Sequence, residues 1–281
     1  MRHRGVAAAG VLAVVSLAGC SASVSKPDGD DVAAAVSAEA EASASAVAGE
    51  VGRAGAGMVA LSPEGLEAVA LADGQAVAGG TVTAQVSDRD FPNAGTVVAK
   101  KAVCTPLATV QAGSVLGAPV SVVRRMWIGP QETSEADLGA DPSDGEVAAA
   151  ALDATTSFVS LASYGQEAAA KVVMAGIGRA VRECAAGGFV YTVAGQDPVK
   201  TVKVQKTAAP AGTGGADEVI AANLTVSVDG VSGPVRVVVV REGGTVGYFP
   251  ATNLASQATG DAFTLPAALV QAQLAQLTEA G

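Results

Sequence analysis

The clearest alternation of apolar and polar positions lies in residues 163–184. Four apolar positions there recur at spacings of four, four and three residues: Val173, Ile177, Val181 and Cys184. Such spacings place the side chains on one face of a helix. Gly187 and Gly188 follow, and glycine suits the left-handed conformation that often ends a helix. We therefore predict one amphipathic helix over residues 163–184.

Several other segments are rich in β-branched residues or alternate between apolar and polar positions, which predicts strands. These segments are residues 81–86, 120–128, 155–161, 189–193, 199–205, 218–228, 235–241 and 246–252. Shorter helices are expected over residues 63–71, after the capping residue Ser62, over 105–111 and from about 264 onward. Consecutive strands with short turns, combined with amphipathic helices, are typical of an α+β fold. We predict an antiparallel sheet with packed helices, in a single domain over residues 58–281.

The first twenty residues have the pattern of an export signal. Arg2 and Arg4 precede a short apolar segment that ends in Leu17-Ala18-Gly19-Cys20, a sequence that resembles a bacterial lipobox. The apolar segment is shorter than the roughly 20 residues that span a bilayer. We predict that residues 1–19 are a lipoprotein signal peptide and that Cys20 carries a diacylglycerol, with acyl chains such as palmitate. The alternative is an ordinary secretory signal with a cysteine there by chance.

Residues 20–57 consist largely of Ala, Ser, Gly, Glu and Val and contain no aromatic residue. Such a segment buries too little apolar surface to fold alone, so we predict a flexible tether. A partial helix over residues 31–51 is the alternative, because Ala and Glu favour helices.

The chain of 281 residues is acidic, with 17 basic and 27 acidic residues and a formal charge of −10. Removing Arg2 and Arg4 with the signal leaves 15 basic residues against the same 27 acidic ones, a formal charge of −12. This charge disfavours nucleic acid as a partner. The abundance of Ala, Val and Gly suggests an actinobacterial genome, and we expect the protein on the outer face of the cell membrane, held there by lipid.

The single histidine, His3, lies in the predicted signal peptide. Its loss excludes Ser-His-Asp triads, Cys-His dyads and histidine metal ligands from the mature chain. We identify no catalytic, cofactor-binding or metal-binding residues and predict that the protein is not an enzyme. Residues 130–146 hold a group of acidic side chains whose spacing does not match an EF-hand: Glu132, Glu135, Asp137, Asp141, Asp144 and Glu146. Calcium binding and simple solvation remain the two interpretations of this loop.

Two of the three cysteines remain once Cys20 is lipidated. In an oxidising compartment they are expected to form a Cys104–Cys184 disulfide, although buried free thiols are the alternative. Five of the nine aromatic residues are candidates to line an apolar cleft, and the alternative is that they belong to the core. They are Trp127, Tyr164, Tyr191, Tyr248 and Phe249.

The order of several motifs resembles a known family. The motifs are LSPEGL, KKAVCTPL, VSLASYGQEAAAKVV ending in VREC, VRVVVVREGGTVGYF and LPAALVQAQLAQL. Together they resemble the extracellular sensor domain of the mycobacterial kinase PknH and the actinobacterial cell-wall lipoproteins that carry this domain alone. The resemblance implies an antiparallel sheet with helices and a cleft for an unknown ligand. Members of the family can carry a second cysteine pair, which this chain lacks.

These observations together predict a non-enzymatic, membrane-anchored extracytoplasmic lipoprotein with a sensor-like ligand-binding domain. Its expected partners are the membrane, through the lipid anchor, and an unknown small molecule, lipid or envelope protein. A protein-interaction subunit of the envelope and a carboxylate-dependent hydrolase are the alternatives.

Overall fold

A computed structural model describes residues 60–87, 91–133, 140–228 and 230–279. All of them belong to one compact unit, Arg53–Gly281. The predicted signal peptide, Cys20 and the tether lie outside the described residues, as does the predicted start of the folded part at residue 58.

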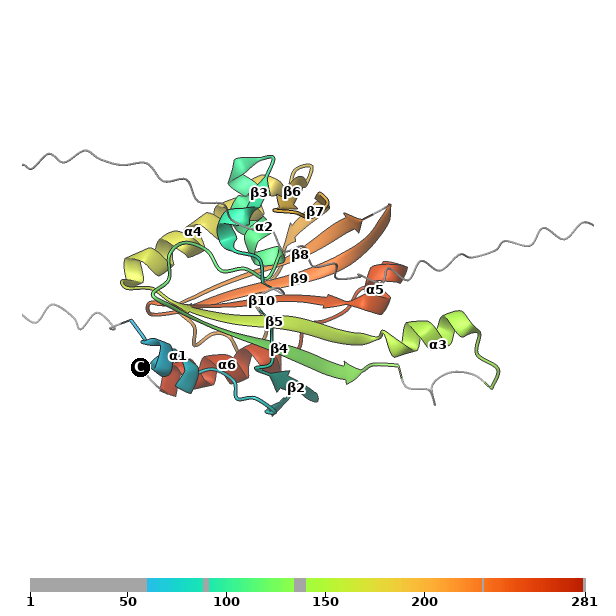
Figure 1. Ribbon diagram of the computed structural model, residues 1–281, viewed down its shortest axis with the longest axis horizontal. Coiled ribbons are helices and arrows are strands. Elements are labelled where there is room, and N and C mark those ends of the chain that lie inside the picture. Colours follow the sequence, from blue (N-terminus) through green and yellow to red (C-terminus); the bar gives the residue numbers. More distant parts are fainter. Residues whose placement is uncertain (1–59, 88–90, 134–139, 229, 280–281) are drawn as a thin grey trace, which may run out of the picture. The chain divides into compact units, whose positions relative to one another are not determined.

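Within the described residues, ten strands form one antiparallel sheet, and helices pack against it (Figure 1). The predicted α+β class with an antiparallel sheet is therefore confirmed. In chain order the strands are β1 (Ala76–Val77), β2 (Gly80–Thr83), β3 (Val97–Ala99), β4 (Ser121–Gln131), β5 (Ala154–Ser163), β6 (Phe189–Val193), β7 (Val199–Lys206), β8 (Glu218–Val228), β9 (Val231–Glu242) and β10 (Thr245–Asn253). Across the sheet they run β1-β2-β4-β5-β10-β9-β8-β7-β6-β3.

Helices cover both faces of this sheet (Figure 1). They are α1 (Pro63–Ala68), α2 (Thr105–Gln111), α3 (Asp144–Ala151), α4 (Glu167–Cys184), α5 (Leu254–Thr259) and α6 (Ala267–Glu279), with short 3-10 turns η2 (Ala94–Thr96) and η3 (Ala102–Cys104). We call the side against which α2 and α4 pack the α4 face, and the side against which α1 and α6 pack the α6 face. None of the helices in the described segments has the length and hydropathy that a bilayer-spanning helix requires.

The predicted central helix exists but begins later than its sequence pattern indicated. Ser163 belongs to β5, where it pairs with Ser121 on one side and Thr245 on the other, so the helix starts only at Glu167. Its buried positions are Ala170, Met174, Ile177, Ala180, Val181 and Cys184. Val173, expected on the apolar stripe, is only half-buried, because Met174 occupies the centre of the face at that turn.

The end of α4 is held by the predicted disulfide. Cys104 and Cys184 are bonded, their Cα atoms lie 6.0 Å apart, and both side chains are fully buried. Next to the disulfide, Lys101 Nζ donates a hydrogen bond to the carbonyl of Glu183. The disulfide therefore joins the last turn of α4 to η3 and the start of α2. The helix ends at Cys184, and its C-cap Ala185 is right-handed, so Gly187 and Gly188 do not cap it as predicted; their positive φ angles of 88° and 64° lie in the turn that follows.

Two helices, α3 and α5, were not predicted from the sequence. The segment predicted as loop up to residue 146 contains the start of α3, which Ser143 caps by accepting a hydrogen bond from the Glu146 amide while the Glu146 carboxylate bonds back to the Ser143 amide. Helix α5 follows β10 directly, because the Asn253 side chain accepts a hydrogen bond from the Ser256 amide. Both helices are short and depend on their caps, so hydrophobic periodicity did not reveal them.

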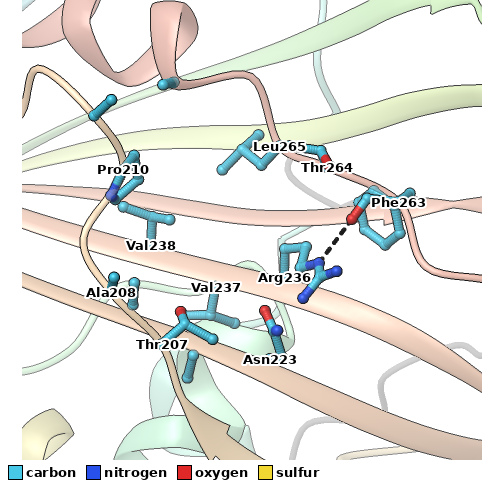
Figure 2. Close-up of a pocket in the computed structure, with 14 residues that line it drawn as sticks. Thr207, Ala208, Pro210, Asn223, Arg236, Val237, Val238, Phe263, Thr264 and Leu265 are labelled. Atoms are coloured by element: carbon cyan, nitrogen blue, oxygen red, sulfur yellow. Dashed lines mark hydrogen bonds between the residues drawn. The ribbon is translucent and has the colours of Figure 1, made fainter.

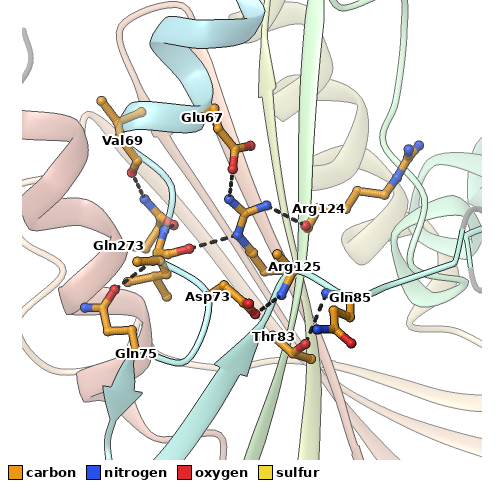
Figure 3. A network of polar contacts seen from close by, with 12 residues as sticks. Glu67, Val69, Asp73, Gln75, Thr83, Gln85, Arg124, Arg125 and Gln273 are labelled. Carbon is orange, nitrogen blue, oxygen red and sulfur yellow. Dashed lines mark hydrogen bonds and ion pairs between the residues drawn. The ribbon is translucent and has the colours of Figure 1, made fainter.

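Helix α1 ends at Ala68, earlier than the predicted end near residue 71. The chain leaves the helix because backbone groups of Val69 and Leu71 bond to the side chain of Gln273 on α6 instead (Figure 3). Strands β1 and β3, of two and three residues, were also missed. They are the edge strands of the sheet, and short edge strands limit unwanted pairing with other chains.

Candidate functional site

A pocket with a volume of about 350 Å³ opens on the α6 face (Figure 2). Its lining residues are Thr207, Ala208, Pro210, Ala211, Ala221, Ala222, Asn223, Arg236, Val237, Val238, Phe263, Thr264, Leu265 and Ala267. Pockets of this size are typical of small-molecule sites, which combine apolar walls with a few convergent polar groups. This composition makes it our candidate functional site.

The floor of the pocket comes from two neighbouring strands. Asn223 on β8 pairs with Arg236 on β9, and Ala221 pairs with Val238 in the same ladder. Successive side chains of a strand point to opposite faces, so residues two apart share a face. Ala221 and Val238 belong to the core of the α6 face, which places Asn223 and Arg236 on that face as well.

Two loops form the walls. Residues 207–211 leave β7, and the amide of Thr207 donates to the carbonyl of Ala221 at 3.0 Å. Residues 263–267 lead into α6, and Phe263 and Leu265 are buried in the core of that face. The side chain of Gln271 on α6 donates to the carbonyl of Ala211, which ties the first loop to α6. Both walls are therefore anchored to regular structure.

Arg236 is the charged residue of this pocket. Its Nε donates to the carbonyl of Phe263 at 2.8 Å, and its guanidinium carbon lies 5.7 Å from the centroid of the Phe263 ring. Partial burial lowers the pKa of Arg236, because the charged form loses hydration. Within the described residues, no carboxylate forms an ion pair with Arg236. The group therefore remains a cation whose position is fixed by Phe263.

The lining residues limit what this pocket can do chemically. None of the described residues that line it is acidic, a cysteine or a lysine. The hydroxyls of Thr207 and Thr264 have no general base beside them among these residues, so the lining offers no activated nucleophile. The arrangement suits binding of a ligand that has an apolar part and a polar or anionic group.

The structure does not bring the five aromatic cleft candidates together. Trp127 and Phe249 lie in the core of the α6 face, whereas Tyr164, Tyr191 and Tyr248 lie in the core of the α4 face. Each is at most 5% exposed, and none of them lines the pocket of Figure 2. The separation follows from strand alternation, since Tyr248 and Phe249 are neighbours on β10 and point to opposite faces. These residues belong to the core, which was the alternative interpretation.

The tyrosines of the α4 face have a buried polar network. The hydroxyls of Tyr164 and Tyr248 lie 2.8 Å apart, and Tyr164 donates to the carbonyl of Leu116 at 2.6 Å. Burial raises the pKa of Tyr164 and of Tyr191 to about 12 and raises that of Tyr248 well above its ordinary value.

We expect the folded protein to show no tyrosinate absorbance at pH 10, because the chain has three tyrosines and the pKa of each is raised. A phenol whose folded pKa exceeds its unfolded value of about 10 stabilises the fold fully below pH 10. That contribution is lost as the pH rises from 10 through 12. Spectrophotometric titration tests this, with the denatured chain as the control that titrates near pH 10. A midpoint near 10 in the folded protein would contradict the buried network.

The acidic loop shows no arrangement of metal ligands in the part that can be described. Glu135 and Asp137 lie outside the described residues, and the carboxylate of Glu146 caps α3. The hydrogen bonds from Ser143 lower the pKa of Glu146. Elsewhere in the described segments, no group of three or more His, Cys, Asp or Glu side chains is placed to hold a metal ion.

A second pocket, between α4 and the strands β7 and β8, is bordered by Arg179, Arg182 and Lys206. All three side chains are exposed, so water already hydrates their charges and they need no ligand. Arg236 differs from them, because it is partly buried and held by a backbone carbonyl.

Sequence reasoning missed the residues of the candidate site. One signal was present: Arg236 interrupts the apolar run of β9 from Val235 to Val240. Charged residues are rare on a covered sheet face unless they have a partner, so this arginine indicated a polar site. Asn223 and Phe263 carry no comparable signal, because nothing local brings residues forty positions apart together.

Comparison with known proteins adds no relative: no protein-family model and no curated protein matches this chain. The resemblance to the PknH-type sensor domain therefore stays a prediction, and the function rests on the geometry of the site.

Proposed function

We propose that this chain is a membrane-anchored extracytoplasmic lipoprotein whose single α+β domain is a non-enzymatic, sensor-like ligand-binding module. The lipobox at Cys20, the tether over residues 20–57 and the resemblance to the PknH-type family support this proposal. The Cys104–Cys184 disulfide supports it independently, because structural disulfides persist in oxidising compartments outside the cytoplasm.

The pocket of Figure 2 is the observation that carries the binding function. Its apolar walls can accommodate a hydrophobic group, while Arg236, Asn223 and two threonine hydroxyls offer polar contacts. The loop 207–211 is tied by hydrogen bonds at Thr207 and Ala211, and Phe263 and Leu265 anchor the other wall in the core, so the pocket is formed before a ligand arrives. A preformed site reduces the ordering cost of binding.

Filling the pocket is expected to abolish ligand binding. Ala208 is exposed at the rim and lines the pocket, so Ala208→Trp introduces an indole there without entering the core. Native mass spectrometry of the purified full chain should detect a co-purifying small molecule in the wild type and lose it in Ala208→Trp.

Ala209→Trp is the matched control, because Ala209 is the next residue, is also exposed and does not line the pocket. It should retain the ligand. Equal retention by both variants would place the ligand elsewhere, and a wild type that carries and binds no small molecule would contradict the proposed function.

A further inference from the structure

We propose that the pocket binds a monoanionic amphiphile, with the ligand's carboxylate on the guanidinium of Arg236 and its apolar chain between the loops 207–211 and 263–267. This inference rests on the proposed function, since it names the class of ligand for the same pocket.

Arg236 differs from two arginines that are buried on the sheet. Arg125 pairs with Glu67 on α1, and Arg241 pairs with Asp217 at 2.8 Å. The chain thus provides a carboxylate for each of these two cations, as burial of a charge requires. Arg236 is partly rather than fully buried, in a chain with an excess of acidic residues, and within the described residues it pairs with no carboxylate, only with the carbonyl and ring of Phe263. An anionic ligand would complete its environment.

The guanidinium of Arg236 is held in one orientation. Nε donates a hydrogen bond to the carbonyl of Phe263, and the guanidinium carbon lies over the ring of the same residue, so the side chain is held before binding (Figure 2). Within the described residues the Nη groups make no hydrogen bond. Two parallel N–H groups of an arginine match the two oxygens of a carboxylate. A fixed fork of this kind favours a carboxylate over a neutral hydroxyl.

The pocket limits the size and the charge of its ligand. A water molecule takes about 30 Å³ of liquid volume, so the pocket of about 350 Å³ has room for roughly a dozen non-hydrogen atoms. Val238, Phe263 and Leu265 supply apolar contacts for the chain of such a ligand. One cation balances one negative charge, and a more highly charged phosphate would meet the net negative field of the protein.

A series of ligands of equal length and different charge tests the proposal without altering the protein. Calorimetry of the purified full chain should show that octanoate binds about 10- to 100-fold more tightly than octan-1-ol, and that octylamine binds more weakly than either. Ala208→Trp under the same conditions supplies the blank for binding outside the pocket. Equal affinity for octanoate and octan-1-ol would overturn the carboxylate assignment while leaving the pocket in place. Failure of all three ligands to bind would overturn both proposals.

Two variants of Arg236 then test its role directly. Arg236→Gln should weaken octanoate binding about 10- to 100-fold and leave octan-1-ol unchanged. Arg236→Lys keeps the charge but loses the two parallel N–H groups. Its affinity for octanoate should lie between those of Arg236→Gln and the wild type. Arg179→Gln is the control, because Arg179 is exposed and lies outside this pocket. Unchanged octanoate binding in Arg236→Gln would overturn the proposal, and the ligand series decides alone if that variant does not fold.

Discussion

Reduction of the Cys104–Cys184 disulfide is expected to lower the melting temperature of the protein by roughly 9–18 °C. The bond closes a loop of 80 residues. In the chain-entropy model a loop of this length contributes about 4.5 kcal/mol to the free energy of unfolding, because it restricts the unfolded chain. For a domain of about this size, each kcal/mol shifts the melting temperature by roughly 2–4 °C.

The location of the bond makes this effect structural as well as entropic. Cys184 is the last residue of α4, and Gly176 and Gly178 within that helix each cost about 1 kcal/mol relative to alanine. The helix therefore depends on its packing against the sheet, and the disulfide anchors its end to η3 and α2. Loss of the bond should loosen the last turns of α4 first.

Thermal unfolding with and without a reductant measures the effect. The double variant Cys104→Ser/Cys184→Ser should melt at the lower temperature and should not respond to the reductant, which makes it the control for reductant effects elsewhere. A wild-type melting curve that the reductant leaves unchanged would show that the bond contributes no stability.

Gln273→Leu is expected to lower the free energy of unfolding by about 2–6 kcal/mol. Gln273 is fully buried on α6, where its Oε1 accepts from the amide of Leu71 at 3.1 Å and its Nε2 donates to the carbonyl of Val69 at 2.6 Å (Figure 3). Leucine fills a similar volume but leaves both backbone groups without a partner. Each buried group left in this way costs about 1–3 kcal/mol.

The same network includes Arg125, whose Nε donates to the carbonyl of Leu71 at 2.9 Å and whose Nη2 pairs with Glu67. The connection between α1 and β1 is thus held by side chains from α6 and from β4. Loss of the Gln273 hydrogen bonds in the variant should also shift α6, which forms part of the wall of the pocket.

Urea denaturation measures the change in stability. Gln276→Leu is the matched control, because Gln276 lies on the same helix and makes no side-chain hydrogen bond within the described residues. It should change the free energy of unfolding by less than about 0.5 kcal/mol. Similar losses in the two variants would mean that the amide of Gln273 is not needed to hold the chain after α1.

Much of the fold could be predicted because its signals are local. Apolar spacing alone located most of α4, and β-branched runs located β4, β5 and β6 to β10 within a few residues at each end. The pairing of Cys104 with Cys184 followed from the count of cysteines and the predicted compartment. The helix and strand patterns depend on residues close together in the chain, and the disulfide could be chosen because only three cysteines exist. Both kinds of information can be taken directly from the sequence.

The errors arose where distant segments compete for the same residues. Ser163 could begin a helix or end a strand, and pairing with both Ser121 and Thr245 decided for the strand. Val69 and Leu71 could continue α1, but hydrogen bonds from Gln273, about two hundred residues away, ended the helix. Propensity is a weak preference, and contacts of this kind override it.

The class of fold, the cysteine pair and the lack of histidine after His3 could be inferred from the amino-acid order alone. The face that each side chain occupies, and the residues that it contacts there, depend on how the chain packs in three dimensions. The register of β8 with β9 brings Asn223 to Arg236, and the loop before α6 places Phe263 on the same cation. The same alternation sends Tyr248 and Phe249 to opposite faces, which removes the aromatic cleft and leaves a pocket around one arginine. A binding site depends on the faces and registers of segments that are far apart in the chain, and those are set only when the sheet assembles.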